Sequence, residues 1–248
     1  MDIKVHSTDQ FKLMPKKIQT PWGEIIPEVS LFPIFYLIFI YGFIYILPYG
    51  RNVIGISWFD WFRSEDGPLE WIQFIQFVIS SVLAFLIYIK SKRKRNLNSI
   101  IWLLIALLSF VIAGEEISWG ERITGIGISS VSEINVQGET NFHNLPFFHN
   151  YLLDPIFEIS CIFLGWVGWR RFHNIKALPS KDLSLYFLSV ALFYFYFDIS
   201  WASTTQQIRN DQEIFEFLLS TGIFLHCFRY FKKLGFVSKL FVKESARN

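Results

Sequence analysis

Six long apolar stretches constrain the fold of this chain more than any other feature. A helix needs about 20 mostly apolar residues to cross the roughly 30 Å hydrocarbon core of a bilayer, and each stretch comes near that length. The composition agrees, since 52% of the residues are hydrophobic and 19% are aromatic. We therefore expect an all-α fold, a polytopic transmembrane helix bundle with about six membrane-spanning helices. The stretches lie at residues 31–48, 70–89, 99–119, 152–169, 183–203 and 213–231.

The basic residues between the stretches predict which side of the membrane each loop faces. Short cytoplasmic loops carry an excess of Lys and Arg, and the 90–98 connection, the 170–181 connection and the C-terminal tail are rich in both. The first 30 residues show no removable signal peptide. We therefore expect an integral protein of the plasma (inner) membrane with cytoplasmic N- and C-termini. Its parts would be an N-terminal segment at 1–30, a six-helix domain at 31–231 with a long outer loop at 120–151, and a basic tail at 232–248.

Charge and cysteine content exclude several other classes. A formal net charge of +2 is too small for a nucleic-acid-binding protein. The two cysteines, Cys161 and Cys227, both lie within apolar stretches and form no CxxC spacing, so neither a disulfide framework nor a thiolate metal site is indicated. The partner that remains is the lipid bilayer, and the oligomeric state stays open.

Acidic residues gather at the predicted outer ends of the helices. An ionised carboxylate near the membrane centre costs roughly 2.5–3.5 kcal/mol on insertion scales, so several at one level need partners. The sequence therefore predicts a polar cavity that faces outwards. Its candidate acidic residues are Glu70, Glu116, Glu158, Asp198, Glu213 and Glu216.

Glu116 is the strongest of these candidates. Small residues at helical spacing over 106–120 place Glu116 towards the other helices and turn Glu115 about 100° away, towards Trp119. Glu116 also lies at a helix C-terminus, where a negative charge is unfavourable by roughly 0.3–1 kcal/mol. Glu70, Glu213 and Glu216 lie in first turns, where capping of the helix offers an alternative explanation.

The loop at 120–151 carries the remaining candidates. Loops of this length are usually functional or disordered, and its run QGETNFHNLPFFHN mixes polar and aromatic residues in a way that favours a segment folded over the bundle. Glu139 precedes His143 by four residues and would share its face in a helix. The alternative is that His143 and His149 are ordinary side chains at the membrane interface, with no role in a site. Three blocks stand out as motif-like: EDGPLEW, GEEISWGER and QGETNFHN.

Carboxylates together with imidazoles are typical ligands of Zn²⁺, Mn²⁺ or Fe²⁺, and a metal would offset the repulsion among the acids. The chain has no HExxH or similar ligand motif, so a divalent metal is an expectation from topology alone. The expected ligands are Glu116, His143, Glu158, Asp198 and Glu216, with Glu70, Glu213 and His149 as further candidates.

We expect a membrane enzyme that hydrolyses, or transfers a group from, a lipid or lipid-linked substrate at its outer face. Glu116 would be the general base or a metal ligand, His143 a proton shuttle or ligand, and Arg122 a holder of phosphate. Two alternatives remain. One is a non-catalytic subunit that docks a partner through its outer acidic and aromatic face. The other is a carrier for a cation or proton, which the scarcity of acids in the inner halves disfavours.

Overall fold

Helices make up most of this protein, and a short antiparallel hairpin of two strands precedes them. The computed structural model describes residues 17–20, 23–46, 53, 55–64, 66–91, 96–136, 138–200 and 206–235. The strands are β1 (Ile18–Thr20) and β2 (Gly23–Ile25). The first half of the chain holds helices α1 (Pro27–Ser30), α2 (Phe32–Leu37), η1 (Ile38–Ile46), α4 (Ile56–Phe62), α5 (Pro68–Ser91), α6 (Leu97–Glu116), η3 (Ser118–Gly120) and α7 (Glu121–Thr124). The second half holds α8 (Ser129–Ser132), η4 (Phe148–Leu152), α9 (Leu153–Ile162), η5 (Phe163–Val167), α10 (Gly168–Arg171), η6 (Lys181–Leu183), α11 (Ser184–Ser200) and α12 (Gln206–Lys233).

Three helices are long and apolar enough to cross a membrane: α5, α6 and the Asp211–Lys233 part of α12. They contain 24, 20 and 23 residues, and at 1.5 Å per residue even the shortest reaches about 30 Å. Only 28% of the apolar window of α5, and of α6, is buried within the protein. Side chains such as Val82 and Leu107 are more than half exposed, at 54% and 53%. Apolar helices with so much uncovered surface indicate a membrane protein.

The other three predicted spans are helical but shorter or interrupted. Residues 31–48 fall on α2 and η1, residues 152–169 on η4, α9, η5 and α10, and residues 183–203 on η6 and α11. The π-helical turns of η5 interrupt the second of these where Gly165 packs closely on α11, since a Cβ at Gly165 would lie 3.0 Å from the Ser184 carbonyl oxygen. The prediction of about six membrane-length helices is therefore confirmed for three. The mostly helical class is confirmed, with the β1–β2 hairpin as a small addition.

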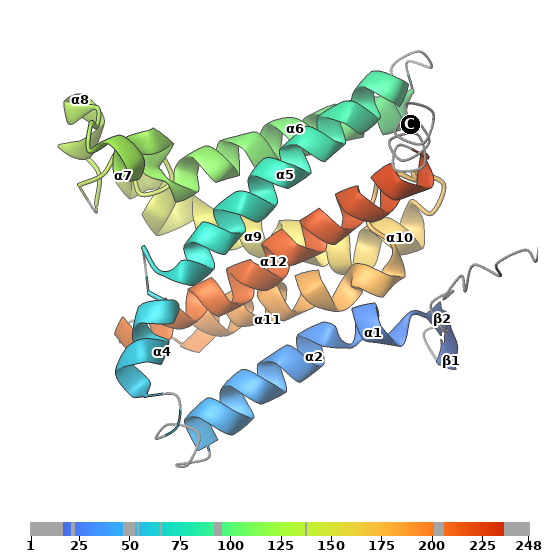
Figure 1. Ribbon diagram of the computed structural model, residues 1–248, viewed down its shortest axis with the longest axis horizontal. Coiled ribbons are helices and arrows are strands. Elements are labelled where there is room, and N and C mark those ends of the chain that lie inside the picture. The colour runs from blue at the N-terminus through green and yellow to red at the C-terminus, as the bar shows by residue number, and fades with distance from the viewer. Residues whose placement is uncertain are drawn as a thin grey trace, which may run out of the picture.

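The long helices lie side by side and are joined by polar contacts. Helix α5 packs along α6 and α12, and α11 packs along α9 and α12. Gln76 of α5 donates a hydrogen bond to Thr221 Oγ1 of α12 at 3.1 Å, and Ser81 of α5 donates to the Ala106 carbonyl of α6 at 2.8 Å. Figure 1 shows α4, α7 and α8 towards one end of these helices, with the last turns of α5 and α12 at the other end.

Helix α4 is tied to the first turns of α12 by a buried ion pair. Arg63 is 1% exposed, and it contacts Asp211 of α12 and Asp60 of α4, the latter at 2.8 Å. Its guanidinium also lies over the Phe59 ring, 5.1 Å from the centroid. This contact holds the segment before α5 against α12, at the end of the bundle where the acidic residues lie.

Candidate functional site

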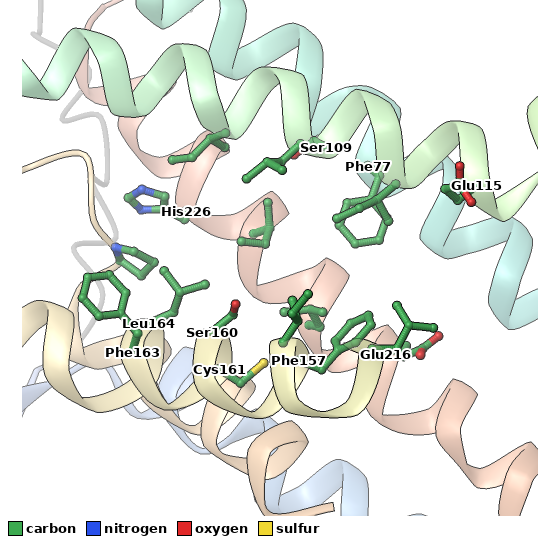
Figure 2. A pocket seen from close by; sticks show the side chains of 18 of the residues that line it. Phe77, Ser109, Glu115, Phe157, Ser160, Cys161, Phe163, Leu164, Glu216 and His226 are labelled. Carbon is green, nitrogen blue, oxygen red and sulfur yellow. The ribbon is translucent and has the colours of Figure 1, made fainter. Parts of the chain in front are cut away.

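A cavity of about 1020 Å³ runs between α6 and α9, with α12 behind it. Its lining contains acidic residues at one end and apolar residues along most of its length. Figure 2 shows Glu115 and Glu216 at one end and His226 at the other, with Phe77 and Leu164 between them. We call the first the carboxylate end, defined by Glu70, Glu115, Glu116, Glu213 and Glu216.

The three motif-like blocks meet at Arg122, which lines the carboxylate end. Its Nη1 lies 2.5 Å from Glu70 Oε1 and 2.9 Å from Asp66 Oδ1, and its Nη2 lies 3.1 Å from Glu139 Oε2. Glu70 and Asp66 belong to EDGPLEW, Arg122 to GEEISWGER and Glu139 to QGETNFHN. We call these four residues the Arg122 cluster. It joins the start of α5 to α7 and to the later part of the 120–151 loop.

The Arg122 cluster changes the role expected for this arginine. Burial by itself lowers the pKa of Arg122, but the Glu70 carboxylate, followed by Glu139 and Asp66, outweighs that effect and raises the pKa above its ordinary value. Both terminal nitrogens already contact carboxylates. A substrate phosphate would have to displace one of them, so the geometry favours a structural clamp over the expected phosphate holder.

A sharp reversal after α6 brings Arg122 back beside α5. Ser118, Trp119 and Gly120 adopt successive positive φ angles of 47°, 54° and 94°. Such conformations cost of order 1–3 kcal/mol for a residue other than glycine, so surrounding contacts must hold them. Ser118 donates to Glu139 at 2.5 Å, and the Trp119 ring lies against Gly114, where a Cβ would be only 3.0 Å from it. The motif GEEISWGER therefore encodes the reversal.

The 120–151 loop is folded, as its composition predicted, but its internal pairing differs from the expected one. His143 does not pair with Glu139. Its Nδ1 lies 3.0 Å from Glu115 Oε2, and the same oxygen accepts from the backbone N–H groups of Phe142 at 2.7 Å and His143 at 2.9 Å. The stretch from Gly138 to Leu145 is not helical, so the four-residue spacing places no shared face there.

Glu115 lines the cavity, and the sequence reasoning did not include it among the candidate site residues. It does turn towards Trp119, as predicted, and accepts a hydrogen bond from the indole at 2.5 Å. It also lines the cavity together with Glu116 and fixes the loop through His143. The available signal was Trp119 four residues later, since an indole donor at that spacing meets the same helix face.

The carboxylates of Glu70, Glu116, Glu213 and Glu216 lie within electrostatic range of one another. Glu213 accepts from Gln73 Nε2 at 2.7 Å, and Glu216 accepts from the Tyr194 hydroxyl at 2.7 Å. Glu116 is partly buried, lines the cavity, and has no hydrogen-bond partner among the residues that the structure describes.

The structure brings together most, but not all, of the expected site residues. Glu70, Glu116, His143, Glu213 and Glu216 all line the cavity.

Glu158 is not among the residues that line this cavity, because α9 presents Phe157, Ser160 and Cys161 to it, which shifts Glu158 to the side. The side chains of His149 and Asp198 lie outside the described part of the chain. Among described residues, no group of three or more His, Cys, Asp or Glu side chains is close enough to hold a metal ion.

The opposite end of the cavity contains a histidine that the sequence reasoning did not consider. His226 of α12 is 7% exposed, donates from Nε2 to the Ala177 carbonyl at 2.9 Å, and stacks on Trp102 with ring centroids 4.9 Å apart. The Ala177 N–H in turn donates to Asn98 Oδ1 at 3.0 Å. Its sequence context, LHCF in an apolar helix, is typical of a core histidine, and only the packing shows that it ends a cavity.

Comparisons with known protein families, with curated proteins and with solved structures found no match for this chain.

Proposed function

We propose that this protein is a multi-pass membrane enzyme that acts on a lipid or lipid-linked substrate, by hydrolysis or group transfer, at a carboxylate and histidine site on the outer face. One observation carries the proposal. A single cavity joins a carboxylate end to a long apolar section between α6 and α9. An amphiphile has the same division into a polar head and an apolar tail, so the cavity matches such a substrate in polarity along its length.

The proposed topology has six crossings of the plasma membrane, with the short or interrupted segments crossing as well. Basic residues support this orientation. The last turns of α5, α10 and α12 hold Lys90, Arg170, Arg171, Lys232 and Lys233. All of these lie at the ends of their helices away from Glu70 and Glu213, so the carboxylate end faces outwards if the basic ends are cytoplasmic.

In the proposed reaction Glu116 is the general base. Its carboxylate takes a proton from water, or from an acceptor hydroxyl, while that oxygen forms a bond to the electrophilic atom of the substrate. The bond from that atom to the leaving oxygen breaks, and the leaving oxygen receives a proton from His143. The products are the substrate fragment carrying the new oxygen and the protonated leaving group.

His143 is suited to the proton transfer because Glu115 orients its ring. The Glu115 carboxylate, 3.0 Å from Nδ1, fixes the orientation of the ring. Nε2 of His143 has no hydrogen-bond partner among the described residues, and the ring lines the cavity. A divalent metal held through Glu116 and Glu216 is the alternative way to offset the repulsion of the cluster, and it would then activate the water.

The two rival functions fit the cavity less well. A cation carrier needs polar groups along its path, whereas the middle of this cavity is lined mainly by apolar side chains such as Phe77, Ile105 and Leu164. A docking subunit would use the exposed outer surface and would have no use for an internal cavity of this size.

The test is product formation in water enriched in ¹⁸O. The purified protein is mixed with vesicles made from the membrane lipids of the cells that produce it, and the lipids are analysed by mass spectrometry. Hydrolysis should yield an ¹⁸O-labelled product, whereas group transfer should yield a new lipid without the label. Glu116→Gln should abolish either product, and Glu133→Gln, an exposed change in the same outer loop, should not. No new lipid species with the parent protein would refute the proposal.

A further inference from the structure

Apolar side chains of α6 and α9 form one side of the cavity. Three apolar residues that line it are also exposed on the surface: Leu104 at 50%, Leu108 at 61% and Ile156 at 49%. The wall of the cavity is therefore continuous with the apolar outer surface of α6, which includes Leu107 at 53% and Val111 at 43%. A molecule dissolved in the hydrocarbon core can move into the cavity without passing through water.

The length of the cavity suits one lipid chain. Its lining on α6 extends from Ile101 to Glu116, which corresponds to about 22 Å at 1.5 Å per residue. Half of a bilayer hydrocarbon core is about 15 Å thick, so an extended acyl chain from the outer leaflet fits within this length. A peptide is a poorer occupant, because its backbone N–H and C=O groups would lack partners beside Phe77, Leu164 and Ile223.

A group of residues joined by hydrogen bonds and ring stacking forms the far end of the cavity. His226 and Ala177 line it and are joined by the 2.9 Å hydrogen bond from Nε2 to the carbonyl oxygen. Asn98 holds the Ala177 N–H at 3.0 Å, and Trp102, which is fully buried, stacks on the His226 ring. We call His226 and Ala177 the floor. These contacts connect the floor to α6 and join α12 to the segment that precedes α11. The floor therefore cannot move away from the cavity without breaking them.

We propose that the cavity binds one acyl chain of a bilayer lipid, which enters sideways between α6 and α9 and ends against the floor, so that the floor sets the longest chain accepted. This proposal deepens the proposed function, since it assumes that the head group lies at the carboxylate end. It adds a chain-length limit and names the residues that impose it.

The experiment uses lysophospholipids of increasing chain length, each with a photoreactive diazirine at the terminal carbon. Retention by the full-length protein is measured by native mass spectrometry, and the crosslinked residues are identified after proteolysis. Retention should stay level or rise as the chain lengthens until the chain meets the floor, and longer chains should then be retained less. The longest retained chain should label the segment around Ala177 or His226.

Two neighbouring residues of α9 provide a matched pair of variants. Ser160 lines the cavity and is exposed, so Ser160→Trp should block it partway and move the limit to shorter chains. Ile159 is 69% exposed and is not among the lining residues, so Ile159→Trp should leave the limit unchanged. His226→Ala should move the limit to longer chains by lowering the floor.

Some outcomes would overturn the proposal. They are an affinity that rises with chain length without a limit, equal effects of Ser160→Trp and Ile159→Trp, and crosslinks confined to outward-facing residues such as Leu107. Turnover in ¹⁸O water is measured on the same preparations. Turnover without a chain-length limit would remove this inference and leave the proposed function, whereas a limit without turnover would remove the function and leave the binding site.

Discussion

Replacing Arg122 by methionine should lower the free energy of unfolding by about 3 kcal/mol. Arg122 and Glu70 form the most buried pair of the Arg122 cluster, with side chains 12% and 10% exposed. Removing one partner of a buried ion pair costs about 3–5 kcal/mol, because the other charge is left uncompensated. We take the lower end because the pair borders a cavity. Asp66, 65% exposed, adds no more than about 1 kcal/mol.

The measurement is reversible unfolding in mixed micelles of detergent and SDS, followed by tryptophan fluorescence. Asp66→Asn is the matched control in the same cluster and should cost less than about 1 kcal/mol. The double variant Arg122→Met with Glu70→Gln should regain most of the lost stability, since no buried charge then stays unpaired. An Arg122→Met protein as stable as the parent, or a double variant no better than the single one, would refute the clamp role of Arg122.

Three further predictions concern the site and the topology. Glu116→Gln should reduce turnover at least a hundredfold with little change in stability, whereas Glu115→Gln should lower both stability and turnover, because Glu115 holds the outer loop and orients His143; equal effects of the two variants in both assays would contradict the division of roles. A reporter active only outside the cytoplasm should work when fused after Ser64 and fail after Lys176, and the reverse pattern would invert the site. If a divalent metal, the alternative to Glu116 acting alone, activates the water, protein purified without chelator should contain Zn, Mn or Fe, and less of it in Glu116→Gln and His143→Ala; equal content in all three would exclude a metal at this site.

The positions of the helices could be predicted from hydropathy, but their continuity could not. All six apolar stretches are mostly helical where the structure describes them. Helices α5, α6 and α12 are each long enough to cross a membrane as one helix. In contrast, π-helical turns interrupt the segment that holds Gly165. Such turns depend on how closely a neighbouring helix approaches, and that distance is set by tertiary packing rather than by local composition.

The end of the bundle at which the acidic residues lie could be predicted from topology. The residues with which they form hydrogen bonds and ion pairs could not. Charge and spacing placed Glu70, Glu116 and Glu216 at one end, and they line one cavity there. The pairing of His143 with Glu115 depends on the reversal at Ser118, whose positive φ no propensity indicates for a residue other than glycine. Sequence spacing assumes a regular helix, so it fails wherever long-range contacts bend the chain.

The most direct test of the central claim is an electron cryo-microscopy map of the protein in a lipid nanodisc, with a bound antibody fragment to increase its size. We predict elongated density between α6 and α9, with its polar end at Glu116 and Glu216 and its other end against His226. Direct packing of α6 on α9, with the carboxylates separated and no space for a chain between the helices, would contradict the account.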